Sequence, residues 1–438
     1  MTDDWSSALL TDRYELTMLQ GALRSGAAHR RTVFEMFARR LPDSRRYGVV
    51  GGTGRFLDAL AAFRFDTAAL DYLADSATVD EATLEWLAGY EFSGDVWGYG
   101  EGDTYFPGSP ILVVEGTFAE CVLLETVALS IFNHDTAIAS AASRMTTAAK
   151  GRPLIEMGSR RTHEAAAVAA ARAAYLAGFA TTSNLEAGRR YGVPTAGTSA
   201  HAFVLLHDSE RHAFTAQLEA VGAGTTLLVD TYDVDRAVHT ALDLAGPELG
   251  GVRIDSGDLG STAERVRRVL DESGAAGTRI VVTGDLDEYA IQGLAIAPVD
   301  GYGVGTSLVT GSGFPTASLV YKLVARARGT GADDRLEPVA KRSVGKPSRG
   351  GRKWGFRRVD ENGTATGEVV YDHETEPGVG MRPLMRRLVA KGEVVGAEPL
   401  ADARARHAAS VAELPEAARQ MSRGEPAIPT YFEQRVGV

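Results

Sequence analysis

The chain has 438 residues, which is enough for two or three domains or for one barrel with additions. Hydrophobic residues make up 44% and charged residues 24%, as in an ordinary soluble globular protein. The net charge of −11 argues against a nucleic-acid binder, because such a protein needs a basic surface. The acidic start and the absence of an apolar run of about 20 residues predict a cytoplasmic protein with no signal peptide and no membrane partner.

Residues 1–120 have the pattern of an α+β segment. Residues 9–26 show apolar side chains near helical spacing and end at a glycine, which predicts a helix with Tyr14 in its first turn. Residues 32–42 alternate between apolar and polar side chains, as in a strand with one buried face. We also expect helices at residues 54–65 and 79–87 and a small antiparallel sheet at residues 95–118.

Residues 121–318 show the rhythm of repeated βα units. After a long helical region, short apolar strands recur, and each ends in polar or glycine residues. The seven segments span residues 153–161, 178–184, 193–201, 225–233, 251–259, 279–287 and 300–308. A doubly wound open sheet is the alternative, but polar ends spread over so many strands favour an irregular (β/α) barrel.

Residues 319–438 return to β runs and turns, followed by further helices. The run Lys341 to Arg358 is rich in basic residues, and we expect a solvated hairpin there. The chain thus divides into an N-terminal α+β part (1–120), a barrel (121–318) and a C-terminal part with the basic hairpin (319–438).

His201 follows a glycine- and hydroxyl-rich turn at the end of the segment 193–201. Histidine changes charge near neutral pH and can act as a nucleophile towards phosphoryl groups. Thr198 supplies a hydroxyl in the same turn. The alternative is a histidine that is merely satisfied by a backbone carbonyl at a strand end.

Charged side chains follow two other strands of the barrel. Arg160 can recognise a carboxylate or a phosphate through its planar fork, or can form a surface ion pair. Arg253 and Asp255 point the same way at a strand end, and Asp258 follows them. This grouping suits a phosphorylated, polyhydroxylated ligand, with the carboxylates on sugar hydroxyls or Mg²⁺. The alternative is a helix cap formed by Asp255 or Ser256, with Asp258 in the first turn.

Two glycine-rich turns end the last predicted strands of the barrel, where such folds often bind phosphate. Glycine lets backbone N–H groups approach a phosphate closely. The residues concerned are Gly284, Asp285, Gly303, Gly305 and Thr306. Neither turn fits a P-loop or a dinucleotide fingerprint. The histidines show no metal-binding spacing, so we expect no structural metal.

Several motifs in fixed order resemble those of nicotinate phosphoribosyltransferases. They are TDRYELTM, FEMFARRLP, EMGSRR, GVPTAGTSAHAF, VRIDSGDL, VTGDLDEY and YGVGTSLVT. The resemblance implies synthesis of nicotinate mononucleotide from nicotinate and phosphoribosyl pyrophosphate, coupled to ATP hydrolysis and assisted by Mg²⁺. It also implies a phosphorylated histidine at His201, nicotinate contacts from Tyr14, Thr198 and Arg253, base and ribose contacts from Arg160 and Asp255, and a phosphoribosyl contact from Thr306.

The same resemblance implies a type II phosphoribosyltransferase fold, in which an irregular α/β barrel packs on an α+β sandwich built from both chain ends. It implies a homodimer with shared active sites, in which Tyr14 comes from the neighbouring subunit. Nicotinamide phosphoribosyltransferases are similar, but they place an aspartate after the strand that here reads GFATTSN. Thr181, Thr182 and Ser183 offer no acid there, which favours a carboxylate substrate over an amide.

Overall fold

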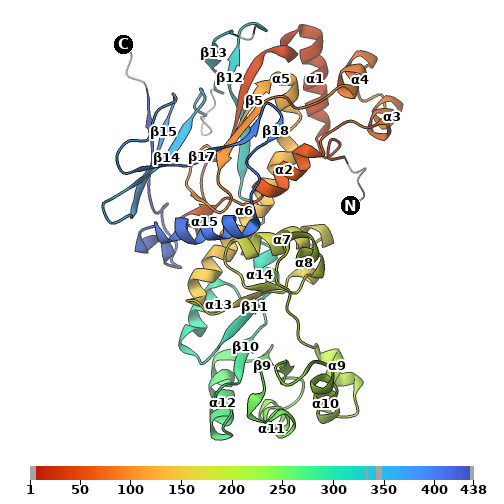
Figure 1. Ribbon diagram of the computed structural model, residues 1–438, viewed down its shortest axis with the longest axis vertical. Coiled ribbons are helices and arrows are strands. Elements are labelled where there is room, and N and C mark those ends of the chain that lie inside the picture. Colours follow the sequence, from red (N-terminus) through yellow and green to blue (C-terminus); the bar gives the residue numbers. More distant parts are fainter. Residues whose placement is uncertain (1–5, 332, 342–347, 435–438) are drawn as a thin grey trace. The chain divides into compact units, whose positions relative to one another are not determined.

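The computed structural model describes residues 6–331, 333–341 and 348–434 (Figure 1). It divides into two compact units, of which unit 1 comprises Met1–Ala137 with Thr316–Val438, and unit 2 comprises Ile138–Pro315. Both ends of the chain therefore build unit 1, while unit 2 is a continuous segment. Helix α6 (Glu125–Ala149) carries the chain from unit 1 into unit 2.

Unit 1 contains a seven-stranded antiparallel sheet in which the interior strand β1 pairs with β12 on one side and β5 on the other. The three N-terminal strands form the middle of this sheet and C-terminal strands flank them on both sides, so neither chain end can form it alone. In spatial order the strands are β13 (Leu336–Pro338), β12 (Leu319–Ala327), β1 (Arg31–Ala38), β5 (Leu112–Thr117), β3 (Asp95–Tyr99), β17 (Met385–Ala390) and β18 (Glu393–Val394).

The strand predicted at residues 32–42 is confirmed as β1, but its expected half-buried pattern is wrong. Only Arg31 is exposed, and the polar Thr32 and Glu35 are buried with the rest. Glu35 tolerates burial because its carboxylate accepts from Lys353 Nζ at 2.7 Å, which leaves neither charge unpaired. The strand is therefore covered on both faces.

Two smaller sheets and a set of helices complete unit 1. The four-stranded sheet consists of β16 (Met381–Pro383), β14 (Trp354–Val359), β15 (Ala365–Tyr371) and β19 (Thr430–Glu433), and the two-stranded sheet of β2 (Gly48–Val49) and β4 (Thr104–Tyr105). The helices are α1 (Arg13–Ser25), α2 (Thr53–Ala61), α3 (Thr67–Asp75), α4 (Glu81–Ala88), α5 (Phe118–Val122) and α15 (Leu400–Ala412). The predicted helices correspond to α1, α2 and α4, whereas α3 was not anticipated. One large apolar cluster of buried side chains unites the seven-stranded sheet with α1–α5.

The expectation of a solvated basic hairpin over Lys341 to Arg358 is wrong for its second half. Residues 342–347 lie outside the described part of the chain. Residues 354–358 belong to β14, and the side chain of Arg357 is fully buried. Its guanidinium donates to Glu368 at 2.8 Å, so a carboxylate from β15 makes burial of this charge possible.

Unit 2 is built on a six-stranded parallel sheet in the order β7-β6-β11-β10-β9-β8. This order is sequential around a circle, with the last strand β11 beside the first strand β6, which is the arrangement of a barrel and not of a doubly wound sheet. The strands are β6 (Leu154–Glu156), β7 (Thr181–Thr182), β8 (Thr226–Leu228), β9 (Gly251–Ile254), β10 (Arg279–Val282) and β11 (Gly301–Val304). The predicted fold class is confirmed, as an α/β half-barrel and a separate sheet domain built from both chain ends.

The segment 193–201 forms no full strand, although we expected one. Its contribution to the sheet is a single parallel bridge between Thr195 and Thr182, the latter in β7. Pro194 has no N–H to donate, and the chain leaves the sheet at Gly197. A ladder of more than one bridge therefore cannot form. The remaining predicted strands of unit 2 are all confirmed.

Helices connect the strands of unit 2 (Figure 1). They are α7 (Glu164–Leu176), α8 (Leu185–Tyr191), α9 (His201–Leu206), α10 (Glu210–Val221), α11 (Val234–Ala245), α12 (Leu259–Glu272), α13 (Glu288–Gly293) and α14 (Thr306–Val309). Across the described residues, only the helical stretch Phe118–Ala149 is long and apolar enough to cross a membrane. Two thirds of its apolar window is buried within the protein, as in a core helix.

Candidate active site

Polar side chains from the carboxyl ends of β8 and β9 meet the loop that leads into α9. The strand-end cluster consists of Thr198, His201, Asp230, Arg253 and Asp255. Four of these five residues were predicted as site residues from the sequence, and the structure brings them together through direct contacts. The carboxyl ends of parallel strands are where α/β barrels place their chemistry, because the connecting loops converge there.

His201 is the first residue of α9 and lies between a hydroxyl and two carboxylates. Its Nδ1 is 3.1 Å from the Thr231 hydroxyl, and its Nε2 is 3.8 Å from one oxygen each of Asp230 and Asp255. The side chain is 39% exposed. The imidazole is thus oriented at one nitrogen and accessible to a ligand at the other.

Asp230 is almost completely buried, with 3% of its side chain exposed. One carboxylate oxygen accepts from the backbone N–H of Asp255 at 2.9 Å and from the Ser256 hydroxyl at 2.7 Å. The other oxygen, Oδ1, is buried without a hydrogen-bond partner and is the one that faces His201. A buried carboxylate oxygen without a partner is costly, which suggests that a cation or donor from a ligand completes it.

Arg253 extends from β9 into the same cluster, with 11% of its side chain exposed. Its guanidinium donates to the Thr198 hydroxyl and, at 3.2 Å, to the carbonyl of Ser199. Asp255, the carboxylate with which it forms an ion pair, lies 3.9 Å away. Burial lowers the pKa of Arg253, against the opposing effect of the nearby carboxylates. A partly buried cation held mainly by neutral groups is suited to binding an anion.

The turn after β10 packs tightly against Asp255. The Thr283 hydroxyl donates to the Asp255 carboxylate. Gly284 has φ +107°, and a Cβ there would lie 2.3 Å from the carbonyl oxygen of Asp255. Only glycine fits both the backbone conformation and the space, so this predicted phosphate turn is fixed against the cluster. Asp285 follows with φ +45° and is exposed.

The turns after β11 and β6 lie further along the same sheet edge. A Cβ on Gly303 would lie 2.7 Å from Met157 Sδ, and Gly305 precedes the short helix that Thr306 begins. Arg160 is exposed in the turn after β6, and its charge contributes to lowering the pKa of Arg253. These residues share the strand-end face with the cluster, but their own role as ligand contacts stays a prediction.

Two predicted site residues have other contacts. Asp258 caps α12 by accepting from the Ser261 N–H at 3.0 Å, and these hydrogen bonds lower its pKa. Its carboxylate therefore caps the helix, whereas the alternative interpretation expected the cap at Asp255 or Ser256 with Asp258 in the first turn. Tyr14 belongs to unit 1, where it is exposed on α1. Partial burial, together with the charge of Glu125, raises its pKa to about 12, so its hydroxyl remains a donor at neutral pH.

Asp230 of the cluster was not predicted from the sequence, and neither were Thr231 and Thr283, which contact the cluster. All three occupy the first or second polar position after an apolar strand, in VVTGD and LLVDT. The same signal that singled out Asp255 could have found them. Among the described residues, no group of three or more histidine, cysteine or acidic side chains forms a metal site. Asp230 and Asp255 nevertheless offer hard oxygen atoms of the kind that Mg²⁺ takes together with substrate phosphates.

Unit 1 has a cavity of about 310 Å³ that we call the cationic pocket. Its lining includes Glu35, Arg39, Pro107, Gly108, Arg349, Lys353 and Phe432. Because Glu35 pairs with Lys353, the guanidinium groups of Arg39 and Arg349 give the lining an excess of positive charge. In a protein of net charge −11, such a pocket is a local concentration of positive charge that suits an anion.

A half-barrel with a cation, two carboxylates, an imidazole and glycine turns at its strand ends is the architecture of an enzyme for phosphorylated sugars. Known proteins share both the sequence and the fold. The family model described as the nicotinate phosphoribosyltransferase N-terminal domain matches residues 9–133. The chain is 58% identical to nicotinate phosphoribosyltransferase pncB1 of Mycobacterium tuberculosis over 97% of this chain and 95% of that one. It is 36% identical to nicotinate phosphoribosyltransferase of Bacillus subtilis, over 74% and 67% of the two chains.

Among solved structures, human nicotinic acid phosphoribosyltransferase superimposes with a TM-score of 0.82 at 27% identity, covering 97% of each chain. The nicotinate-nucleotide pyrophosphorylase of Pyrococcus furiosus, at 24% identity and a TM-score of 0.75, shares the fold over 94% of this chain and 97% of that one. The chain therefore belongs to the nicotinate phosphoribosyltransferase family.

Proposed function

We propose that this chain joins nicotinate to phosphoribosyl pyrophosphate, yielding nicotinate mononucleotide and pyrophosphate with coupled hydrolysis of ATP. This reaction is the step by which nicotinate enters NAD salvage, and we place it in the cytoplasm. The pyridine nitrogen attacks ribose C1, the bond from C1 to the pyrophosphate oxygen breaks, and pyrophosphate leaves with the electron pair. The protein must hold the reactants in line and stabilise the leaving charge.

The observation that carries this proposal is the position of Arg253 within the strand-end cluster of a family member. The guanidinium is partly buried, is oriented by Thr198, and has neutral oxygens as its nearest partners. It can pair with the nicotinate carboxylate, and Arg160 adds positive charge nearby. The glycine turns at Gly284, Gly303 and Gly305 offer backbone amides to the phosphate groups of the donor.

His201 would accept the γ-phosphoryl group of ATP. With the Nδ1–H donating to the Thr231 hydroxyl, the lone pair lies on Nε2, the nitrogen on the accessible side. Nε2 attacks the γ-phosphorus, the bond to the ADP oxygen breaks and ADP leaves, and water later releases inorganic phosphate. The glycosyl transfer itself needs no protein nucleophile, so this histidine serves the energy coupling.

Asp230 and Asp255 are the residues that we expect to hold Mg²⁺, because the buried Asp230 Oδ1 lacks a partner and both carboxylates face Nε2. Bound there, the ion would offset the charge of incoming phosphates. Without it, two carboxylates 3.8 Å from Nε2 would repel the phosphoryl group that the histidine must receive.

We further propose a homodimer with shared active sites, in which unit 1 of one subunit completes the strand-end cluster of its partner. Tyr14 is exposed and remains a hydrogen-bond donor, and the cationic pocket adds Arg39 and Arg349. The donor carries more phosphate charge than Arg160 alone can balance, because Arg253 pairs with the nicotinate carboxylate. Mixing Tyr14→Ala with His201→Ala chains should restore activity through hybrid dimers. No recovery after confirmed subunit exchange would count against sharing.

The direct test is incubation with labelled nicotinate, phosphoribosyl pyrophosphate, Mg²⁺ and ATP. Labelled mononucleotide and stoichiometric pyrophosphate are expected, and omission of ATP should lower the rate. A chain that binds the donor but forms no mononucleotide under any of these conditions would be a phosphosugar-binding barrel without activity.

A further inference from the structure

The wall of the cationic pocket is a tight turn, Phe106 to Ser109, whose middle residues Pro107 and Gly108 line the cavity. The Ser109 side chain closes this turn. Its hydroxyl oxygen accepts from the Phe106 N–H at 3.0 Å and also lies 2.7 Å from the Phe106 carbonyl oxygen. The shape of the wall therefore depends on where the Ser109 hydroxyl is held.

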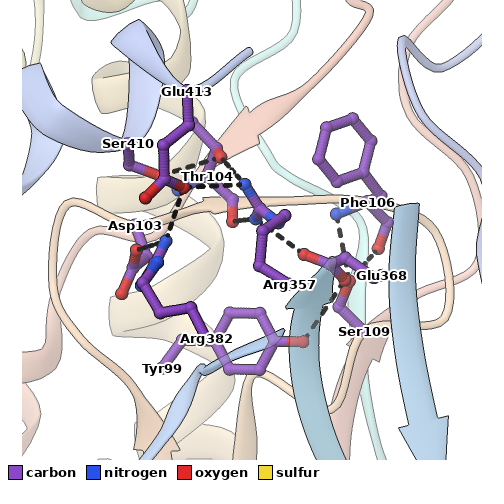
Figure 2. A network of polar contacts seen from close by, with 10 residues as sticks. All are labelled: Tyr99, Asp103, Thr104, Phe106, Ser109, Arg357, Glu368, Arg382, Ser410 and Glu413. Atoms are coloured by element: carbon purple, nitrogen blue, oxygen red, sulfur yellow. Dashed lines mark hydrogen bonds and ion pairs between the residues drawn. The ribbon is translucent and has the colours of Figure 1, made fainter. Parts of the chain in front are cut away.

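Glu368, in β15, holds that hydroxyl from the interior of unit 1 (Figure 2). One of its carboxylate oxygens accepts from Ser109 and from the Tyr99 hydroxyl, the latter at 3.3 Å. The other accepts from Arg357 at 2.8 Å. All four side chains are fully buried, so the contacts are shielded from water and the carboxylate has little freedom to move.

The same strand also fixes the opposite side of the pocket. β15 pairs in parallel with β19, where Val370 lies opposite Phe432. A Cβ on Gly108 would lie 2.9 Å from the Phe432 ring, so the turn and this ring are in close contact. The Arg349 guanidinium lies 4.2 Å from the centre of the Phe432 ring. The turn, the ring and the cation thus form one continuous series of contacts.

We infer that Glu368 and Ser109 are positioning residues for the cationic pocket. They hold the Phe106–Ser109 turn against Phe432 and thereby set the place of the Arg349 guanidinium. Neither residue lines the cavity. The inference rests on the proposed function, in that the anion to be positioned is a phosphate group of the donor. Its expected signature is a change in donor affinity without a change in the chemical step.

The test compares two serines of the network in Figure 2. Ser109→Ala removes the hydroxyl that holds the turn. Ser410→Ala removes an equally buried hydroxyl, which bonds Thr104 at 2.9 Å on the far side of the network. We expect Ser109→Ala to raise KM for phosphoribosyl pyrophosphate about tenfold, with kcat and KM for nicotinate within twofold. Ser410→Ala should lower Tm by a similar amount. It should leave kcat and both KM values within twofold of the wild-type values.

Equal donor KM values in the two serine variants would overturn the inference. Gly108→Ala provides a second variant, because its added methyl group presses on Phe432 without touching the buried network. It should also raise donor KM, and a wild-type value would count against the role of the turn. The dissociation constant of inorganic pyrophosphate, measured by calorimetry, should likewise be higher in Ser109→Ala and Gly108→Ala than in Ser410→Ala and the wild type. If the wild-type chain forms no mononucleotide, the proposed function fails, while the pyrophosphate constants still decide the positioning role.

Discussion

Two buried carboxylates, one in each unit, show how differently this molecule uses charge. In unit 1, both oxygens of Glu368 are bonded, to Arg357, Ser109 and Tyr99. In unit 2, Asp230 has one oxygen bonded by two donors and the other buried without a hydrogen-bond partner. Bonding partners make the burial of a carboxylate tolerable, whereas an unsatisfied buried oxygen costs stability unless a ligand completes it.

The arginines show the same contrast. Arg357 is fully buried and donates to the carboxylate of Glu368 and to Thr104. Arg253 reaches its nearest carboxylate at 3.9 Å and is held by a hydroxyl and a carbonyl instead. We infer that the network of unit 1 maintains the fold around the cationic pocket, whereas Arg253 in the cluster of unit 2 is placed to bind an anion. Each half of this comparison predicts a different response to mutation.

Removing Arg357 should give the largest effect, and it should be on stability. Arg357→Leu leaves Glu368 buried without a cation, and we expect a loss of about 5 kcal/mol in the free energy of unfolding. The tryptophans among the described residues, Trp86, Trp97 and Trp354, all lie in unit 1, so tryptophan fluorescence during urea unfolding reports on this unit. The double variant with Glu368→Leu should recover most of the loss. A cost below about 1 kcal/mol for the single variant would show that the pair matters little.

Removing Arg253 should change activity rather than stability. Arg253→Ala deletes the cation for the nicotinate carboxylate, and we expect kcat/KM for nicotinate to fall about 1000-fold, roughly 4 kcal/mol. The matched control is Arg265→Ala, which removes an exposed arginine paired with Asp235 in the same unit and should change kcat/KM less than twofold. An equal loss in both variants would contradict a specific role of Arg253.

The preference for nicotinate over nicotinamide should be the next largest effect. Nicotinamide leaves the guanidinium of Arg253 without a partner charge, so kcat/KM should favour nicotinate by about 100-fold, roughly 2.7 kcal/mol. Competition assays with the two labelled bases measure this ratio. Comparable kcat/KM values for nicotinate and nicotinamide would contradict this prediction and would indicate the specificity of the nicotinamide phosphoribosyltransferases.

The smallest predicted effect is a pH dependence of stability in unit 1. Burial lowers the pKa of His407 in α15 to about 4, below its value of about 6.5 in an unfolded chain. The unfolded chain therefore takes up the proton first as the pH falls, and stability is lost from about pH 6.5 down to about pH 4. From pH 7 to pH 5 this group should cost about 2 kcal/mol. His407→Gln should show a correspondingly weaker dependence, and identical pH profiles would refute the assignment.

Sequence patterns could predict what depends on neighbours along the chain. An apolar run followed by polar residues marks a strand end, which located Arg253, Asp255 and Gly284 and would also have located Asp230. The segment 193–201 shows the limit of this signal, because its small residues and Pro194 end an apolar run without forming a ladder. Its His201 nevertheless joins the cluster, since the loop after the bridge lies beside β8 and β9.

Contacts between distant segments could not be predicted in this way. Lys353 and Arg357 lie in a run of basic residues that indicates a solvated loop. Lys353 instead meets Glu35, 318 positions away, and Arg357 meets Glu368 across a strand pair. Asp258 shows a local ambiguity, because the sequence offered it as a ligand contact or as a first-turn residue of a helix capped by Asp255 or Ser256. In the structure Asp258 is itself the cap.

The most direct measurement of the central claim is ATP coupling in His201→Asn. If His201 accepts the phosphoryl group, this variant should lose ATP hydrolysis and any acid-labile, base-stable phosphoenzyme. Slow ATP-independent formation of nicotinate mononucleotide should remain, with higher KM values, because Arg253 and the glycine turns are intact. ATP-dependent stimulation of synthesis that survives in His201→Asn would contradict the account and leave the histidine as no more than a donor to phosphate.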